Sequence, residues 1–119
     1  METITAITEV NGGIKGFVVK TTERRFVIGI GNVRGCCERW GSTAPPGLLD
    51  FVGATIEKGG YSVVEMDDSD SYDTGGIATL CINTSKGTLE LAVFNYHNGY
   101  YGHAWSFKID DETKESGVI

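Results

Sequence analysis

Two runs in the last third of the chain, 77–84 (IATLCINT) and 88–95 (TLELAVFN), are separated only by the short segment 85–87 (SKG). Both runs are rich in β-branched and apolar residues, which favour strands. A short connection that contains glycine is typical of a β-hairpin. This part of the sequence therefore predicts two paired antiparallel strands and indicates a β-rich fold.

Other parts of the chain show the same extended pattern. Residues 3–10 (TITAITEV), 14–20 (IKGFVVK) and 25–30 (RFVIGI) are separated by polar or glycine-containing turns, which predicts a three-stranded meander. Asn98-Gly99 suits the tip of a type I′ turn, because both central residues of that turn need positive φ. The segment 101–109 (YGHAWSFKI) is then expected to return as a strand and to complete a second meander.

The middle of the chain is less regular. Pro45 and Pro46 are tolerated in the first turn of a helix, so a short helix is expected near residues 45–52. Residues 55–57 and 61–65 are expected as two strand pieces, and the run 67–73 as a solvated loop. We therefore predict an α+β, mainly β fold, in which antiparallel hairpins and meanders form one or two packed sheets with one short helix.

The chain of 119 residues shows no internal repeat or linker, which predicts a single β-rich domain over 1–110 and a polar C-terminal tail over 111–119. No apolar run reaches the roughly 20 residues of a membrane span, and the start METITAITEV lacks the features of a secretory signal. Three cysteines without CxxC spacing favour reduced thiols. These features together predict a cytoplasmic protein.

Charge is distributed unevenly along the chain. The net charge is −6, but residues 1–42 carry six basic and four acidic side chains, whereas residues 43–119 carry four basic and twelve acidic ones. An acidic surface repels nucleic acid and is attracted to basic clefts, so we expect a nucleic-acid-binding protein as partner rather than nucleic acid itself. The alternative is that the acidic residues only keep a small domain soluble.

The acidic run 65–73 holds five carboxylates in nine residues and lacks the glycine and glutamate that an EF-hand loop requires. Spaced carboxylates can occupy the phosphate sites of a nuclease or a DNA-binding protein. The alternative is a mobile charged loop. On the first interpretation, the partner-binding residues include Asp67, Asp68, Asp70 and Asp73.

The segment 95–103 (NYHNGYYGH) contains both histidines of the chain and three tyrosines. Exposed tyrosines beside a rigid turn would supply aromatic anchors for a partner, which adds to the partner-binding set Tyr96, Tyr100 and Tyr101. The histidines could join residues 36–38 in a mixed metal or ligand site, and the candidate ligands are Cys36, Cys37, Glu38, His97 and His103. The alternative is that the tyrosines pack on the sheet while the histidines form local hydrogen bonds.

Cysteine–histidine catalysis would need a thiolate from residues 36–37 beside His97 or His103. The chain contains no P-loop, GxSxG, HExxH or helix-opening GxGxxG motif. We therefore expect a protein that is not an enzyme and uses no cofactor.

The segments 36–41 (CCERWG), 51–54 (FVGA) and 95–103 together resemble a family of small bacterial and phage domains of unknown function, with a CCE pattern followed by YNxHNGYYGH. The resemblance covers roughly residues 20 to 109, and this chain departs from it at Phe94, where the family usually has tyrosine. The resemblance implies a domain found in phages and mobile elements, and it assigns no activity.

The expected function is a non-enzymatic binding protein of a phage or mobile element that inhibits a host protein, for example an anti-CRISPR or another anti-defence inhibitor. Such a protein would act in the host cytoplasm, without contact to a membrane. The alternative is a small-ligand or metal-binding module built on the CCE and HNGYYGH segments. A homodimer is left open.

Overall fold

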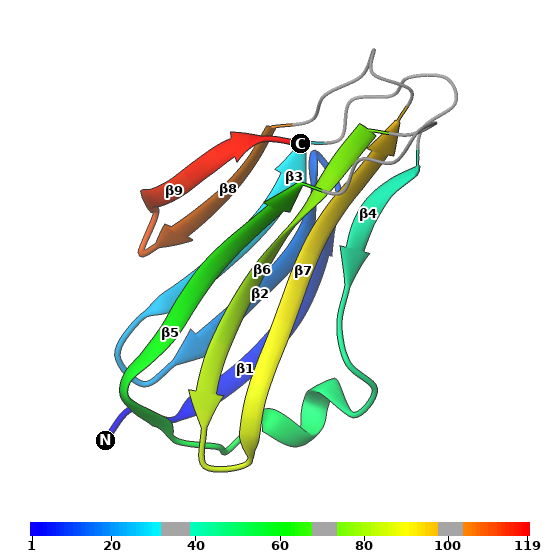
Figure 1. Ribbon diagram of the computed structural model, residues 1–119. Helices are drawn as coiled ribbons and strands as arrows, with labels where there is room; N and C mark the ends of the chain where they lie inside the picture. Colours follow the sequence, from blue (N-terminus) through cyan, green and yellow to red (C-terminus); the bar gives the residue numbers. More distant parts are fainter. Residues whose placement is uncertain (32–38, 68–73, 98–103) are drawn as a thin grey trace.

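The computed structural model describes residues 1–31, 39–67, 74–97 and 104–119. Within these residues the chain forms nine strands and one short 3-10 helix (Figure 1). The first elements are β1 (Ile4–Asn11), β2 (Ile14–Thr21), β3 (Arg25–Gly31), β4 (Arg39–Thr43) and the helical turn η1 (Leu48–Phe51). The others are β5 (Ile56–Asp67), β6 (Thr74–Thr84), β7 (Gly87–His97), β8 (Ala104–Ile109) and β9 (Glu112–Val118).

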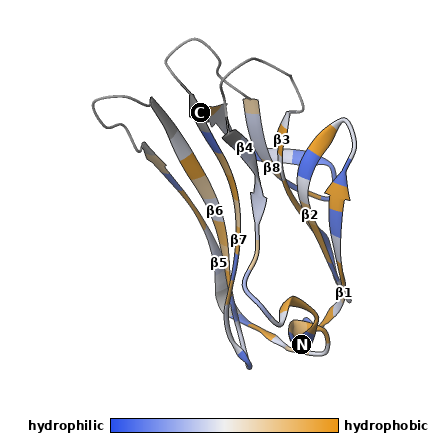
Figure 2. Cartoon of the chain, turned by 90° about the vertical axis from the view of Figure 1, so that its right-hand side faces the viewer, coloured by the Kyte–Doolittle hydropathy of each residue, from blue (hydrophilic) through white to orange (hydrophobic). Residues whose placement is uncertain are grey.

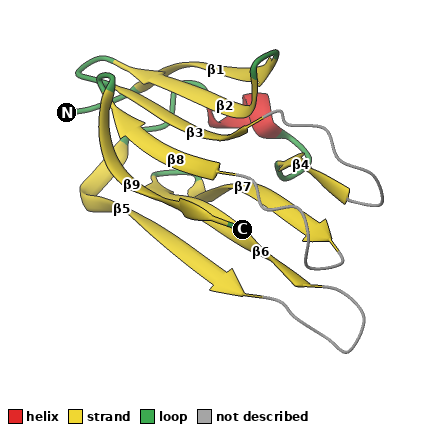
Figure 3. Cartoon of the chain, turned by 90° about the horizontal axis from the view of Figure 1, so that it is seen from above, coloured by secondary structure: helices red, strands yellow, loops and turns green. Residues whose placement is uncertain are grey.

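The described strands pair antiparallel in two sheets. One sheet has five strands in the order β1-β2-β3-β8-β9, and the other has four in the order β4-β7-β6-β5. The sheets face each other, and η1 lies at one end of the space between them (Figures 1 and 2). Figure 3 shows the two layers from above. The predicted fold of antiparallel hairpins in packed sheets, with one short helical turn, is confirmed.

The core lies between the sheets and follows from the alternation of side chains along each strand. Phe26 and Ile28 of β3 and Leu91 and Val93 of β7 are fully buried, while the residues between them face outward or lie half-buried. Full burial of one such side chain stabilises the fold by roughly 1.5–3 kcal/mol. The other large side chains with almost no exposed surface are Ile4, Val19, Ile30, Leu80, Ile82, Leu89 and Phe107.

Aromatic side chains connect the two sheets. The ring of Phe26 on β3 meets the ring of Tyr61 on β5 edge to face, with centroids 5.4 Å apart. Phe107 on β8 stacks with Phe26 at 6.2 Å and lies 5.7 Å from Tyr61. Such pairs add about 0.5–1.5 kcal/mol each beyond the area that they bury. This cluster therefore holds β5 against β3 and β8.

An ion pair lies over the same cluster. The guanidinium of Arg24 is 4.7 Å from the centroid of the Phe26 ring and donates two hydrogen bonds to Glu2, to Oε2 at 2.8 Å and Oε1 at 2.9 Å. The hydroxyl of Thr21 donates to the same carboxylate at 2.6 Å. Burial alone would raise the pKa of Glu2, but the hydrogen bonds from Arg24 and Thr21 and the charge of Arg24 outweigh it, so the pKa lies below 4.5.

The expected second meander is wrong in its last strand. β7 lies between β4 and β6, whereas β8 pairs with β3, from Phe26↔Ile109 to Ile30↔Trp105. The strands before and after Asn98-Gly99 thus belong to different sheets, and the predicted hairpin tip itself lies outside the described residues. The physical reason is that the apolar face of β8 is buried by pairing beside β3, which a local turn signal does not specify.

Two further expectations about strands need correction. β5 is continuous, with a register shift between Ile56 and Tyr61, so the two expected strand pieces form one strand, and Asp67 lies at its end rather than in a solvated loop. Residues 111–119, expected as a polar tail, include β9, which pairs with β8, and Ile119 is buried. The residues of β9 are mostly polar and exposed, so its sequence lacks the alternation of apolar and polar residues that predicts a strand. Backbone pairing at the edge of the sheet forms it.

Candidate functional site

Strand register brings two sequence-predicted segments to one end of the four-stranded sheet. Asp67, the last residue of β5, pairs with Gly76 of β6, which in turn pairs with Asn95 of β7. Tyr96 follows Asn95 and pairs on its other side with Arg39. The start of the acidic run and the start of the tyrosine-rich run therefore lie at the same end of this sheet (Figure 1).

Of the predicted metal or ligand residues, the described part of the chain contains only His97. His97 ends β7 and pairs with Thr74, the first residue of β6. Arg39, which follows Glu38 in the sequence, pairs with Tyr96, so the segments before β4 and after β7 leave the sheet from adjacent strands. Within the described residues, no group of three or more histidine, cysteine or acidic side chains could hold a metal ion. The other predicted site residues lie outside the described residues: Cys36, Cys37, Glu38, Asp68, Asp70, Asp73, Tyr100, Tyr101 and His103.

A buried polar contact lies next to these strand ends. The Nδ2 group of Asn95 donates a hydrogen bond of 2.8 Å to the backbone oxygen of Ile119, and both residues are buried. A Cβ atom at Gly76 would lie 2.9 Å from Cγ2 of Ile119 and 2.9 Å from the backbone oxygen of Met66. The end of the described chain thus packs closely against β6 and β7, beside the candidate site.

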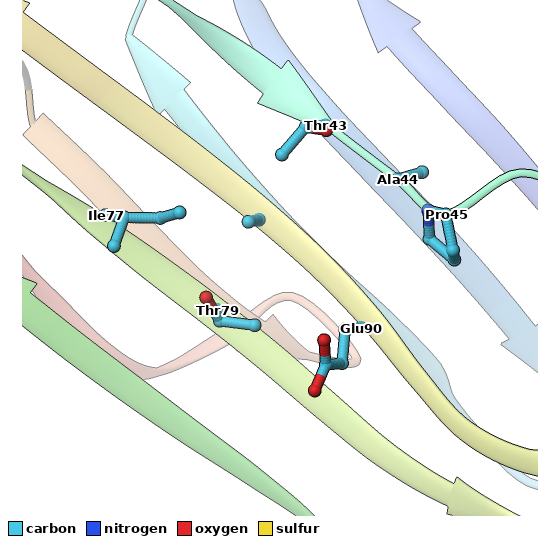
Figure 4. Close-up of a pocket in the computed structure, with 7 residues that line it drawn as sticks. Thr43, Ala44, Pro45, Ile77, Thr79 and Glu90 are labelled. Atoms are coloured by element: carbon cyan, nitrogen blue, oxygen red, sulfur yellow. The ribbon is translucent and has the colours of Figure 1, made fainter.

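The outer face of the four-stranded sheet carries a hollow that the sequence did not reveal (Figure 4). It is lined by small, apolar and hydroxyl-bearing side chains from the end of β4, the loop after it, β6 and β7, together with the carboxylate of Glu90. Ala92 lies at its floor and is only 6% exposed although it faces outward. Toward the edge of the sheet, Val64 and Met66 on β5 are 46% and 60% exposed. The lining residues are Thr43, Ala44, Pro45, Ile77, Thr79, Glu90 and Ala92.

Among the described residues, the one cysteine is Cys81, and its thiol is free and half-buried. It faces outward on β6, between Ser62 of β5 and Glu90 of β7. Burial, and then the negative charge of Glu90, raise the pKa of the Cys81 thiol. A nucleophilic thiol needs the opposite shift, because the thiolate is the reactive form. The environment of Cys81 therefore disfavours thiol chemistry.

A polar notch lies between the edges of the two sheets. Glu65 reaches from β5 toward β8 and β9, and its carboxylate oxygens lie 3.2 and 3.3 Å from the position of a Cβ atom at Gly117. The indole Nε1 of Trp105 lies 2.8 Å from the same position. Within the described residues this Nε1 is buried and has no hydrogen-bond partner. The glycine at position 117 is thus required by the close approach of Trp105.

Sequence reasoning missed the hollow and the notch for the same reason. Each combines residues of strands that are distant along the chain, such as Thr43 with Thr79, or Glu65 with Trp105. Neither set of lining residues forms a local pattern in the sequence that could have marked it.

No helix in the described part of the chain has the length and apolar character needed to cross a membrane. No curated protein and no solved structure matches the chain. A family described as a domain of unknown function (DUF7448) matches residues 3–107, which include β1 to β7 and most of β8. The chain therefore belongs to the DUF7448 family of domains of unknown function.

Proposed function

We propose that this chain is a non-enzymatic binding protein of phage or mobile-element type that inhibits a host protein. An anti-CRISPR or another anti-defence inhibitor acting in the host cytoplasm is its concrete form. The observation that supports this proposal is the register that brings Asp67 and Tyr96 to one end of the four-stranded sheet. Acidic and tyrosine side chains carried by that end would form one surface with both charge and aromatic anchors.

The partner that fits such a surface is a nucleic-acid-binding effector with a basic cleft. Carboxylates there replace phosphates, and the excess of acidic residues over 43–119 adds long-range attraction. Attraction between opposite charges accelerates association, and the association rate constant falls as salt screens these charges.

The test is a pull-down from lysate of a bacterial host, followed by association kinetics with the partner that is identified. The test variant replaces the four aspartates at 67, 68, 70 and 73 by asparagine. A matched control removes four exposed carboxylates elsewhere, by changing Glu23, Asp50, Glu57 and Glu112 to their amides. We expect the test variant to associate more slowly and with a weaker salt dependence than the control. Equal association rates and salt slopes in both variants would contradict binding through this end of the sheet.

The second candidate function is a small-ligand or metal-binding module. It is favoured by the pairing of Arg39 with Tyr96, because this pairing connects the segment that ends in Glu38 to the strand that ends in His97. Native mass spectrometry of the protein as purified tests this candidate. A bound metal or small molecule that is lost when His97 is replaced by alanine would favour the module over the inhibitor.

A further inference from the structure

The hairpin that joins β8 to β9 turns through two residues, Asp110 and Asp111, because Ile109 pairs with Glu112. Both aspartates have positive φ, 51° and 67°, and within the described residues they are the only residues other than glycine that do. Aspartate tolerates this left-handed region better than most residues, but less well than glycine. At the β6–β7 hairpin, by contrast, a positive φ is taken by Gly87. The β8–β9 turn therefore stores backbone strain.

The strand that follows this turn is held mainly by backbone pairing. β9 is the outermost strand of its sheet, and six of its seven residues are exposed. The β8–β9 ladder is also interrupted by a register shift between Phe107 and Lys108. The anchors of β9 lie at its far end, where Gly117 meets Trp105 and the buried Ile119 packs against β6 and β7. β9 can therefore leave β8 without breaking any other pairing of the described strands.

Arg25 at the start of β3 holds the turn from the other side. The backbone N–H of Asp110 donates to the backbone oxygen of Arg25 at 3.0 Å, and the backbone N–H of Arg25 donates to Oδ1 of Asp110 at 2.9 Å. The first of these bonds precedes the torsions that must change, so it can persist when the turn opens. The guanidinium of Arg25 also pairs with Asp111, whose side chain is 80% exposed. An ion pair this exposed contributes little to stability.

Opening the turn would let β8 and β9 run on as one extended strand. Two copies opened in this way can pair antiparallel, with β9 of each copy against β8 of the other. Short loops under strain favour such exchange. We propose that this chain dimerises by exchanging β9 at the Asp110–Asp111 hinge. The accepting edge of β8 fits the exchanged strand, because each pairing is one that the structure already shows within a single copy.

The exchanged dimer is isologous and closed, because each copy gives and receives the same strand. Both hinges become extended, a conformation that any residue adopts, so each dimer relieves the strain of two turns. The carboxylates of the two hinges then lie close together, and salt that screens their repulsion should shift the equilibrium toward the dimer. This salt dependence is opposite in sign to that expected with the proposed host partner. The exchange needs only the purified chain and does not depend on that partner.

The first test asks whether β9 itself changes partner. Ser106 of β8 pairs with Ser116 of β9, so Ser106→Cys and Ser116→Cys are made separately, each in a background with Cys36, Cys37 and Cys81 replaced by serine. The two proteins are unfolded, mixed, refolded together at high concentration and treated with a short bifunctional maleimide. Exchange places position 106 of one copy opposite position 116 of the other, at about 4.5–5.5 Å between Cβ atoms. We therefore expect a cross-linked heterodimer on a denaturing gel.

Two controls make this result decisive. Leu49→Cys mixed with Ser106→Cys measures linking by random collision, because Leu49 is 68% exposed on η1 and lies outside the exchanged strand. A single chain with both Ser106→Cys and Ser116→Cys, refolded at low concentration, should link internally and stay monomeric, which shows that the pair can be linked. If that chain links internally while the test mixture gives no heterodimer above the collision control, the proposal is wrong. A dimer formed through any other surface would give this negative result.

The second test changes the strain at the hinge and follows dimerisation of the refolded chain by sedimentation velocity. Each dimer contains two hinges, so a change in strain counts twice in its dissociation constant. Asp111→Val should strengthen the dimer and Asp111→Gly should weaken it, each by about tenfold or more, because the left-handed region excludes β-branched residues and accepts glycine. Asp111→Asn removes the charge but tolerates that region, so it should stay near the wild type. Equal shifts in all three variants would show that charge controls association, which contradicts the strained hinge.

Discussion

The two sheets enclose one core but are assembled from different parts of the chain. The four-stranded sheet uses only residues between 39 and 97, and its strands β5, β6 and β7 pair in sequence order. The five-stranded sheet joins β1–β3 to β8 and β9, so β3 pairs with a strand some eighty residues further along the chain, as in Phe26↔Ile109. The first sheet depends mainly on local hairpins, and the second depends on contacts that form only in the complete fold.

The largest expected effect is at the aromatic bridge between the sheets. Phe26→Ala should lower the free energy of unfolding by about 3–5 kcal/mol, because it leaves a cavity and removes the contacts with Tyr61 and Phe107. Phe94→Ala on the outer face of the four-stranded sheet is the matched control, since Phe94 is only half-buried. Its cost should be about 1 kcal/mol. Urea unfolding measures both, and equal costs would show that the bridge is not what holds the sheets together.

The next effect compares two glycines of the five-stranded sheet. Gly16→Ala should destabilise by about 3 kcal/mol, because the new Cβ atom would overlap the backbone oxygen of Ile28 and force β2 away from β3. Gly31→Ala should leave the melting temperature unchanged or raise it, since among the described residues a Cβ atom there would meet only the backbone oxygen of Ala104, at 3.5 Å. Thermal unfolding of the two variants side by side decides this, and a destabilised Gly31→Ala would contradict the difference in space between the two positions.

A third prediction concerns the ion pair beside the aromatic bridge. Glu2→Gln should lower the free energy of unfolding at neutral pH by about 1–2 kcal/mol, because it weakens the hydrogen bonds from Arg24 and Thr21. The pKa of Glu2 is lower in the folded protein than its ordinary value of 4.5, so this contribution is present above pH 4.5 and is lost as the pH falls through the lowered pKa. Chemical unfolding from pH 7 to pH 3 should therefore show the wild type approaching the variant. A stability difference that stays constant down to pH 3 would argue against the ion pair as its cause.

The hairpin of the four-stranded sheet offers a smaller test. Gly87 has a φ of 112°, where other residues are strained. Gly87→Ala should cost about 1 kcal/mol. Gly53→Ala, at a φ of 92° in the loop after η1, is a control with similar backbone strain outside the sheets. Thermal unfolding compares them, and a neutral Gly87→Ala would show that the hairpin does not need its turn conformation.

The smallest expected effect is on the reactivity of Cys81. Because burial and Glu90 raise the pKa of its thiol, less thiolate is present at pH 8, and alkylation should be slower in the folded than in the unfolded protein. The measurement uses a variant with Cys36 and Cys37 replaced by serine, so that only this thiol reacts. Glu90→Gln should speed the folded-state reaction modestly. Faster alkylation in the folded protein than in the unfolded one would revive a role for this thiol.

Much of the local structure could be predicted from particular residues. The alternation of Phe26, Ile28 and Ile30 gave the inward face of β3, and the turn before Gly87 gave the hairpin of β6 and β7. The proline pair before Leu48 indicated the short helical turn η1. Of the candidate site, only Asp67, Tyr96 and His97 lie in the described residues, and their functional roles stay predictions.

What the sequence by itself determined is where the chain is extended and where it turns, because side-chain alternation and glycine-rich turns act within a few residues. Only the tertiary structure decided that β8, which follows the tyrosine-rich segment 95–103 in the sequence, pairs in the opposite sheet from β7. It also decided that the polar residues 112–118 form an edge strand and that Glu65 reaches toward Trp105. Each of these depends on which distant strand supplies the pairing groups and the apolar surface. That choice is made by the burial of the whole core, which no local pattern contains.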